Sequence, residues 1–541
     1  MDFKKERKKD TKEVLNSPAR QRIIIGGPGT GKSHLFKEVI EKKVNEGKTN
    51  FLAITFLGRL ADNLADDLAG LADTTTLHGF ALRILKRDSK LSDWNYCPNI
   101  KKIIKEDLEI LGITEWSIAD ENYKKRSSFY KAFGDDDVIY YVIKYLEKNP
   151  EAIPKFDLIL IDEFQDFTEI EAKFIEILAS KNEVLIVGDD DQALYIFRDA
   201  SPKHIREKFL KEREGVSKHV LRFCSRCPET IIRAYHSIIN SEDFKMLETS
   251  RLDKEYICYL PEKEEDSRLN PKIIILKNIP PGGIASVIQR ELEQILKEQK
   301  IKTVLVIGEP TKTAKTREQT FNLLKRYGFK NVRLIKEKEF FKKDFYTAYN
   351  LLAEDLDSDL GWRILSQQLA EDLSDQLKEI FLTGEKSIAD ILPGDFVSKH
   401  RGNIKTFKIL KSNEKGRIRN LSDQDIDLLE KAIVNKKIQK RDIIRKEINK
   451  INKSIKRPIQ NLEISVGSTL GAKGLSADVT FLIGFDQGIF PKEEDPKLSE
   501  FYQMIVALTR ARKRLYCINT INKEISKFVD YLGEDNFIIV N

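Results

Sequence analysis

The sequence contains little cysteine, methionine or tryptophan: five, three and three residues among 541. Only Cys224 and Cys227 have C-x-x-C spacing, and no second pair or histidine cluster completes a zinc site, so we interpret them as packing residues. No apolar run reaches the roughly 18 residues that a membrane span needs. The basic start MDFKKERKKD lacks the apolar stretch of a signal peptide. We therefore expect a cytoplasmic protein without a membrane partner.

A large excess of charge of one sign is also missing. The chain has 93 lysines and arginines against 86 acids, a formal charge of +7 and a pI of about 8.7. This balance permits a polyanionic partner but does not require one. With 41% apolar residues, a chain of this length can form sizeable cores in several domains. Composition therefore indicates a multidomain globular protein, and the function must come from motifs.

The first motif is a glycine-rich loop in residues 22–33, RIIIGGPGTGKS, between an aliphatic strand and a segment with helical spacing. It fulfils the pattern G-x-x-x-x-G-K-[ST], in which backbone N–H groups converge on phosphate oxygens. Lys32 would reach the outer phosphates and Ser33 would bind Mg²⁺. An ordinary glycine-rich turn is the alternative. The predicted nucleotide-binding residues are Gly26, Gly29, Thr30, Gly31, Lys32 and Ser33.

The second motif is LILIDEFQDF, residues 158–167, where acids follow directly on a buried strand. A strand next to the strand of the glycine-rich loop would bring Asp162 to the Mg²⁺ ion. It would also bring Glu163 to the attacking water as a general base. The metal and the phosphates would neutralise charge that is otherwise unfavourable at a strand end. An unremarkable loop or helix start is the alternative.

Further stretches follow in an order that resembles the motifs of UvrD/Rep-like superfamily 1 helicases. The third family motif is similar to VLIVGDDDQALYIFRDA, and the last to a segment with T-R-A-R. The resemblance runs from one end of the chain to the other. The matching stretches are 51–56 (FLAITF), 75–85 (TTLHGFALRIL), 184–200, 221–232 (LRFCSRCPETII), 471–491 (GAKGLSADVTFLIGFDQGIFP) and 501–518 (FYQMIVALTRARKRLYCI).

The resemblance implies an α/β fold of two RecA-like P-loop domains with parallel sheets, each carrying a mostly helical insertion. It also implies that Gln192, Arg226 and Arg510 surround the γ-phosphate beside Glu163, with both arginines coming from the second lobe. An arginine that reaches across a cleft stabilises transition-state charge only when the lobes close, which would couple closure to hydrolysis. Isolated arginines would instead be surface charges.

By the same resemblance, a set of aromatic and polar residues lies along or near a single-strand channel. Aromatic faces stack on any base, and an arginine can contact a phosphate, so such contacts tolerate any sequence. Core packing is the competing interpretation for two of the aromatic residues, Phe56 and Phe197. The predicted DNA-binding residues are Phe56, Thr76, His78, Tyr195, Phe197 and Arg198.

The chain departs from the family where the family contacts adenosine. Ser225 stands where the family has a tyrosine that stacks on adenine, and no glutamine precedes the glycine-rich loop at the usual spacing. Leu470 replaces a histidine, and Ser476 replaces a glutamate that contacts the ribose. ATP and Mg²⁺ are the predicted cofactors, but these departures weaken the expectation of strict ATP selectivity and leave GTP and dATP open.

Both predicted insertions are short for the family. In the second, residues 435–458 (NKKIQKRDIIRKEINKINKSIKRP) predict an amphipathic basic helix that contacts DNA or a partner, unless it is a solvated face over a core stripe. The predicted domains are lobe 1A at 1–85 and 155–220 with insertion 1B at 86–154, and lobe 2A at 221–365 and 461–541 with insertion 2B at 366–460.

The leading functional hypothesis is an ATP-dependent translocase or helicase on single-stranded or tailed duplex DNA, moving 3′ to 5′ as the resemblance implies. The second is a nucleotide-gated DNA-sensing subunit that regulates a partner nuclease. Short UvrD-like chains resemble helicase subunits of prokaryotic antiviral defence systems such as Gabija, although DNA repair or recombination is the competing pathway. The third is a P-loop ATPase that binds no nucleic acid, which would require the channel aromatics to be buried.

Overall fold

The computed structural model describes residues 2–87, 94–98, 100–196, 200–258, 260–335, 343–369, 372–411 and 458–541. Phe197, Arg198 and nearly all of the predicted basic helix at 435–458 therefore lie outside the described residues. The chain forms two compact units, and each combines segments that are far apart in the sequence. The first unit is Met1–Leu77, Pro150–Glu337 and Lys456–Asn541, and the second is His78–Asn149 and Lys338–Ile455.

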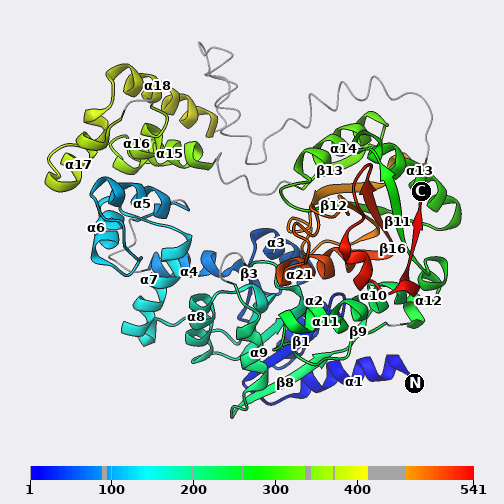
Figure 1. The fold of residues 1–541 in the computed structure, drawn as a ribbon. Coiled ribbons are helices and arrows are strands. Elements are labelled where there is room, and N and C mark those ends of the chain that lie inside the picture. Colours follow the sequence, from blue (N-terminus) through cyan, green and yellow to red (C-terminus); the bar gives the residue numbers. More distant parts are fainter. Residues whose placement is uncertain are drawn as a thin grey trace. The chain divides into compact units, whose positions relative to one another are not determined.

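The first unit contains a six-stranded parallel sheet in the order β3-β2-β6-β7-β1-β8 (Figure 1). Its central strands are almost wholly apolar and buried, as expected for strands covered on both faces. The strands are β1 (Gln21–Gly26), β2 (Phe51–Thr55), β3 (Asp73–Thr76), β6 (Leu158–Ile161), β7 (Val184–Gly188) and β8 (Val216–Leu221). The helices of this part are α1 (Phe3–Asn16), α2 (Lys32–Asn45), α3 (Gly58–Asp67), α8 (Glu169–Ala179) and α9 (Lys203–Leu210).

This strand order positions the predicted chemistry. Parallel strands end at the same edge of a sheet, so the segments that follow β1, β6 and β7 emerge side by side. These segments carry the glycine-rich loop, Asp162 with Glu163, and Asp189 with Gln192. The motifs that lie far apart in the sequence therefore meet at one sheet edge.

The same unit contains a seven-stranded parallel sheet in the order β13-β14-β12-β15-β16-β11-β17. The prediction of two parallel α/β sheets is thus confirmed. The strands are β11 (Ile273–Ile279), β12 (Thr303–Gly308), β13 (Asn331–Leu334), β14 (Glu463–Ser468), β15 (Ala477–Ile483), β16 (Ala511–Thr520) and β17 (Phe537–Val540). A two-stranded ribbon, β9 (Phe223–Cys224) with β10 (Ile257–Cys258), lies in the segment between the two sheets.

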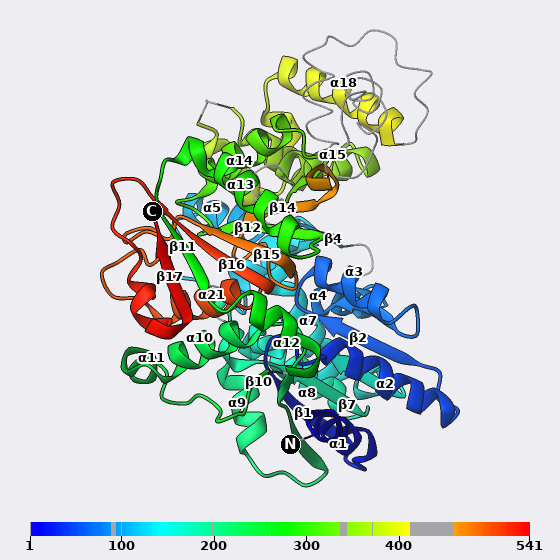
Figure 2. The same cartoon turned by 90° about the vertical axis from the view of Figure 1, so that its right-hand side faces the viewer.

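Helices cover both faces of the second sheet. Alternate side chains of each strand point to opposite faces, so neighbouring residues of one strand belong to different cores. Val306 belongs to the core under α13 and α14, and Ile307 to the core under α10 and α21. Figure 2 shows these two pairs of helices on opposite sides of the sheet. The helices are α10 (Glu229–Asn240), α11 (Glu242–Leu247), α12 (Leu260–Leu269), α13 (Ile284–Glu298), α14 (Ala314–Arg326) and α21 (Leu498–Leu508).

The second unit is mostly helical and has one core that combines both insertions. Ile104 and Tyr123 pack there with Trp362 and Phe381. Residues 343–365, which the sequence assigns to lobe 2A, belong to this unit, and apolar side chains among them such as Trp362 enter this core. The elements are α4 (Leu77–Leu85), β4 (Asn95–Tyr96), α5 (Ile100–Ile110), α6 (Glu121–Phe129), β5 (Ala132–Phe133), α7 (Asp135–Lys148), α15 (Lys343–Glu354), α16 (Asp359–Ser366), α17 (Ser374–Thr383) and α18 (Gly394–Lys411).

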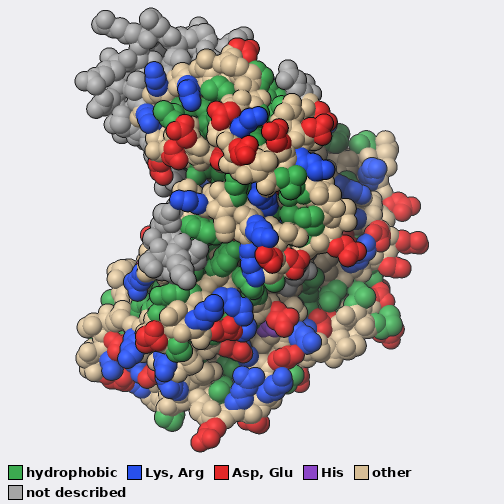
Figure 3. All heavy atoms as spheres, turned by 90° about the vertical axis from the view of Figure 1, so that its left-hand side faces the viewer, with side chains coloured by type: hydrophobic (Ala, Val, Ile, Leu, Met, Phe, Trp, Pro, Cys, Tyr) green, Lys and Arg blue, Asp and Glu red, His purple; other side chains and the backbone are tan. Residues whose placement is uncertain are grey.

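The surface agrees with the nearly balanced composition. On the face shown in Figure 3, lysine and arginine side chains are interspersed with aspartates and glutamates. Among the helices that the structure describes, none has the length and apolar character needed to span a membrane.

Candidate functional site

The glycine-rich loop connects β1 to α2 as the sequence predicts. Gly29 has φ 74° and Gly31 has φ 92°, conformations that side chains other than glycine rarely adopt. Thr30 Oγ1 donates to the carbonyl oxygen of Gly27 at 2.9 Å, which closes the turn. The loop therefore bends sharply enough for its backbone N–H groups to surround an anion.

Lys32 already folds over this loop. Its Nζ donates to the carbonyl oxygens of Gly26 at 3.0 Å and Gly27 at 3.2 Å. These are weak partners for an ammonium group compared with phosphate oxygens, because a charged acceptor strengthens the hydrogen bond. The loop thus holds a cation beside the place where phosphates would bind.

A cavity of about 450 Å³ opens at this loop. Its lining combines residues of two parts of the first unit, the domain of the six-stranded sheet and the domain of the seven-stranded sheet. Of the predicted nucleotide-binding residues, Gly26 and Thr30 shape the loop without lining this cavity. The cavity does bring together the other predicted nucleotide, metal and catalytic residues. They are Gly29, Gly31, Lys32, Ser33, Asp162, Glu163, Gln192, Arg226 and Arg510.

Glu163 is held by neighbours that explain the D-E-x-Q-D spacing. Its φ of 55° is unusual for a residue with a side chain, and such strained backbone is concentrated at functional sites. Gln165 Nε2 donates to Glu163 Oε2 at 2.6 Å, and Gln165 Oε1 accepts from the backbone N–H of Asp189 at 3.0 Å. The glutamine therefore fixes the carboxylate relative to the end of β7.

The two adjacent acids have opposite pKa shifts. Loss of hydration deep in the cavity, together with the negative charge of Glu163, raises the pKa of Asp162 to about 7. Loss of hydration acts on Glu163 as well, but the charges of Lys473 and Lys32 outweigh it and lower the pKa of Glu163 to about 2. Glu163 is therefore a carboxylate at neutral pH, as a general base must be.

Burial and Glu163 outweigh the charges of Lys32 and Lys473, which act to lower the pKa of Asp162, and this bears on the expected metal. The carboxylate of Asp162 and the hydroxyl of Ser33 line the same cavity and are hard oxygen donors of the kind that Mg²⁺ binds. A divalent ion between them would favour the ionised form of Asp162. The residues therefore fit a magnesium ion, which Ser33 and Asp162 would hold.

Lys473 is a residue of this site that the sequence interpretation missed. It is 2% exposed, and its Nζ forms an ion pair with Asp166, lies 3.8 Å from Glu163 Oε2 and donates to the carbonyl oxygen of Gln192 at 3.2 Å. Burial would lower its pKa, but Asp166 and Glu163 raise the pKa above the ordinary value, so it remains charged. The stretch G-A-K-G-L contains this lysine, but only the fold reveals its buried acid partners.

Replacement of Lys473 tests whether its charge stabilises the folded protein by neutralising Asp166 and Glu163. Lys473→Met should lower the free energy of unfolding by about 3 kcal/mol or more, because it leaves buried carboxylates without a counter-charge. Urea unfolding in the absence of nucleotide measures the effect. Lys203→Met is the matched control, because Lys203 pairs with Glu207 on the surface, and the expected loss is below about 1 kcal/mol. Equal losses in the two variants would contradict this account.

Arg510 belongs to the domain of the seven-stranded sheet and forms a hydrogen bond with Gln192 of the six-stranded sheet's domain. Its Nη2 donates to Gln192 Oε1 at 3.0 Å, while Nε and Nη1 donate to the carbonyl oxygens of Val506 and Leu475. Gln192 Nε2 in turn donates to Asp189 Oδ2 at 2.5 Å. Burial and the like charge of Arg226 lower the pKa of Arg510 to about 9. The crowding of positive charge favours an anion in this cavity.

The glycine-rich loop also contacts the segment that carries Arg226. Ser225 donates to the carbonyl oxygen of Gly29 from its backbone N–H at 3.0 Å and from Oγ at 3.2 Å. A Cβ atom at Gly29 would lie 2.3 Å from Cβ of Arg226, so only glycine allows this approach. Ser225, which stands where the family has a stacking tyrosine, therefore contacts the glycine-rich loop.

The predicted DNA-binding residues are only partly brought together. Phe56 follows β2, and Thr76 ends the neighbouring strand β3 at the same sheet edge. The Phe56 ring packs against Tyr195 with centroids 4.9 Å apart and against Phe167 at 5.8 Å. Tyr195 is 8% exposed and Phe56 is half-buried, which accords with the packing alternative for Phe56. His78 begins the second compact unit.

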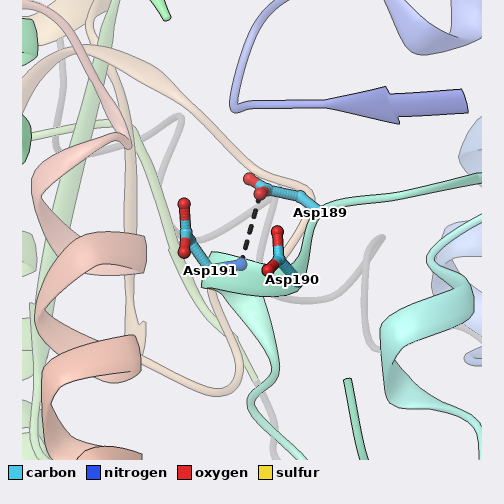
Figure 4. Close-up of side chains that lie close together, drawn as sticks. All are labelled: Asp189, Asp190 and Asp191. Carbon is cyan, nitrogen blue, oxygen red and sulfur yellow. Dashed lines mark hydrogen bonds between the residues drawn. The ribbon is translucent and has the colours of Figure 1, made fainter. Parts of the chain in front are cut away.

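Three consecutive aspartates, residues 189–191, come close enough to suggest a metal site (Figure 4). Lys254 Nζ instead lies 2.6, 2.5 and 2.9 Å from their carboxylates in chain order. Arg206 and Arg251 pair with the second and third aspartates at 2.9 and 2.8 Å. Protein cations neutralise this buried cluster, so we assign it a structural role.

Known proteins resemble this chain in the same region and beyond it. The family model of an AAA domain matches residues 11–198. Probable DNA helicase II homologs of Mycoplasma capricolum and Mycoplasma genitalium are each 22% identical, over 96% and 97% of this chain and 86% and 87% of their own lengths. The ATP-dependent DNA helicase PcrA of Staphylococcus aureus is 26% identical over 47% of this chain and 43% of its own length.

The length of these alignments is informative. The alignment with the Mycoplasma capricolum protein runs over 646 positions, whereas this chain has 541 residues. More than a hundred of those positions therefore have no counterpart in this chain. The relative carries segments that this chain lacks.

Proposed function

We propose, from the homology of this chain to the UvrD/Rep-like superfamily 1 helicases, that it hydrolyses ATP to move along single-stranded DNA and to separate duplex strands, in the 3′ to 5′ direction. The observation that carries the proposal is the cavity lined by Lys32 and Glu163 from one parallel-sheet domain and by Arg510 from the other. A nucleotide bound there would contact both domains, so its hydrolysis would change how they meet.

The side chains have distinct tasks in this proposal. Lys32 and the backbone N–H groups of the loop bind the triphosphate. Magnesium, when bound, neutralises phosphate charge and aligns the phosphates. Glu163, oriented by Gln165, accepts a proton from the attacking water, and Gln192 orients that water. The carboxylate of Glu163 suits this role because its pKa, lowered to about 2, keeps it ionised.

The arginines act on the transition state. Arg226 and Arg510 line the same cavity as the glycine-rich loop. Their guanidinium groups would stabilise the negative charge on the oxygens of the transferring phosphoryl group. Since they contribute only when the two domains are in contact, hydrolysis requires the closed arrangement.

In this proposal, Lys473 connects hydrolysis to DNA. Its Nζ contacts the carboxylates of Glu163 and Asp166 and also lies 5.7 Å from the centre of the Tyr195 ring. Asp166 Oδ1 accepts from the backbone N–H of Leu194, directly before that tyrosine. A shift of charge at Glu163 would therefore act on the Tyr195 and Phe56 pair, which we propose meets the DNA bases as the domains change position.

Steady-state hydrolysis tests this function. ATP turnover by the purified protein should rise several-fold when single-stranded DNA is added. A duplex with a 3′ tail should be separated, and one with a 5′ tail should not. An identical hydrolysis rate with and without DNA would contradict the proposal.

A second candidate function is suggested by the alignment positions of the Mycoplasma capricolum relative that have no counterpart in this chain. A chain that lacks segments of its relatives has less surface for gripping duplex DNA, and would then act as a nucleotide-gated DNA sensor that regulates a partner nuclease. DNA-stimulated hydrolysis without separation of a 3′-tailed duplex by the protein alone would favour this candidate. Separation by the protein alone would favour the motor.

A further inference from the structure

Arg59 lies in the first turn of α3, shortly after Phe56, and its side chain contacts the domain of the seven-stranded sheet. Its Nη2 donates to the backbone carbonyl oxygen of Lys473 at 2.7 Å. The neighbouring Leu60 packs so closely against Gly474 that a Cβ atom at this glycine would lie 2.3 Å from Leu60 Cδ2. The start of α3 therefore rests on the segment that follows β14.

The guanidinium group of Arg59 has more donors than its surroundings use. An arginine side chain carries several N–H donors and no acceptor. The Nε atom of Arg59 is buried and has no hydrogen-bond partner in the part of the chain that the structure describes. A buried donor of a charged group is unfavourable without an acceptor. An anion that reached this group would therefore be bound favourably.

The backbone at the start of α3 offers further donors. Leu57 is the N-cap residue, and no side chain forms a capping hydrogen bond there. The first N–H groups of a helix have no partner within the helix, and their partial positive charge favours an anion. Arg59 belongs to this first turn, so the backbone and the side chain would act on the same anion.

A second arginine, Arg333, comes from the seven-stranded sheet. It lies on the edge strand β13 opposite Ser465 of β14, and its Nε donates to Ser465 Oγ at 2.7 Å. Val332 faces the core under α13 and α14, so the side chain of Arg333 points to the other face of the sheet. Ile335, on that other face, packs against the core that Phe56 also contacts. Arg333 therefore lies on the face of the sheet that packs against the six-stranded sheet's domain.

The two arginines are close enough for their like charges to interact. Loss of hydration and the charge of Arg333 lower the pKa of Arg59, whereas Tyr195 acts in the opposite sense. Within the described ranges, their hydrogen bonds go to a carbonyl and a hydroxyl oxygen and not to a carboxylate. The side chain of Arg333 is exposed. Two neighbouring cations without an acid between them attract an anion.

We propose that Arg59 and Arg333 bind one phosphodiester group of single-stranded DNA between the two domains. The proposal rests on the proposed function in requiring that the chain binds single-stranded DNA. The position suits such a strand, because Arg59 follows Phe56 closely in the chain and contacts Lys473. The Nζ atom of Lys473 lies 5.7 Å from the centre of the Tyr195 ring, the second aromatic group proposed to meet the bases.

One arginine of this pair comes from each domain. The phosphate would accept charge-assisted hydrogen bonds from both guanidinium groups, whose planar forks suit phosphate oxygens. The strength of this contact would therefore depend on how the two domains meet. The pair would supply a grip on the DNA backbone that is independent of base sequence.

The affinity for a fluorescent oligodeoxythymidine, measured without nucleotide, tests the proposal. Arg59→Gln and Arg333→Gln should each reduce the affinity about tenfold at low salt, the effect of roughly one charge-assisted hydrogen bond. Because both arginines bind the same phosphate, the double variant should lose much less than the roughly hundredfold that independent contacts would give. The slope of log affinity against log salt concentration should become shallower by about 0.7 in the double variant, the value for one phosphate of a single strand.

Two further variants serve as controls. Arg326→Gln removes the same charge from an exposed position on α14, which covers the opposite face of the seven-stranded sheet, so affinity and salt slope should not change. Arg59→Lys keeps the charge but loses the fork, so it should retain the salt slope with an intermediate affinity. If Arg59 only held α3 against Lys473, its substitution would not alter the salt slope.

An unchanged affinity and salt slope in the double variant would overturn the proposal, as would losses that simply multiply. If Arg59→Gln does not fold, Arg333→Gln alone decides, because Arg333 is exposed. Failure of the proposed function gives a different result, namely hydrolysis that DNA does not stimulate, which leaves the effect of the arginines on DNA affinity intact. If the unmodified protein bound no oligodeoxythymidine, both proposals would be refuted.

Discussion

Glu163→Gln should reduce ATP turnover by about 10²- to 10⁴-fold and leave nucleotide affinity within a factor of about three. The amide has nearly the shape of the carboxylate and still offers an oxygen to Gln165 Nε2, which donates to Glu163 Oε2 at 2.6 Å. It cannot accept a proton from water at neutral pH. Single-turnover hydrolysis and equilibrium nucleotide binding separate the two effects.

Glu169→Gln is the matched control for this substitution. Glu169 lies in the first turn of α8, shortly after the same strand, and its side chain is exposed. The control should hydrolyse ATP at the unmodified rate. If Glu163→Gln retained turnover within tenfold of the unmodified protein, Glu163 would not be the general base.

Arg510→Ala is the second substitution with a large expected effect. It should lower the rate of hydrolysis by about 10³-fold, as the loss of an arginine finger does. The reason is geometric as well as electrostatic: Arg510 donates to Gln192 Oε1 at 3.0 Å, so its removal also frees the side chain proposed to orient the water. Rapid-quench measurement of single turnovers would report the chemical step.

Controls distinguish this effect from loss of structure. Arg510→Lys keeps the charge but not the planar fork that serves several acceptors at once, so it should remain strongly impaired. Arg290→Ala changes an arginine that is exposed on α13, and this variant should hydrolyse ATP at the unmodified rate. Nucleotide binding by Arg510→Ala, measured with a fluorescent ATP analogue, would show that this variant is folded. A hydrolysis rate within tenfold of the unmodified protein would exclude Arg510 from the reaction.

The sequence predicts the fold class and the neighbourhood of the cavity because these follow from local patterns. A glycine-rich loop must follow a strand and precede a helix, and acids after a buried strand must emerge at a sheet edge. Parallel strand order then brings Asp162 to Lys32 and Ser33, although β7 lies between β1 and β6, which the sequence predicted to be neighbours. The two parallel sheets confirm the predicted fold class. The catalytic roles of these residues remain predictions that the substitutions above test.

Tertiary partners decide the features that the sequence could not predict. Nothing in G-A-K-G-L shows that Lys473 is buried between acids that come from the other sheet's domain. In the same way, the sequence does not show that Glu6 and Asp10 of α1 pair with Arg222, which lies more than 200 residues further along the chain. The aromatic residues Phe56 and Tyr195 carry a stacking signal in the sequence, but their mutual contact depends on how strand ends meet.

The most direct test of the account is whether nucleotide and DNA affect each other's binding. The affinity of Glu163→Gln for ATP would be measured with and without a single-stranded oligonucleotide, and its affinity for the oligonucleotide with and without ATP. If the domains close over the triphosphate and thereby alter the grip on DNA, both affinities must change by the same factor. Affinities for ATP that are identical with and without the oligonucleotide would contradict the account.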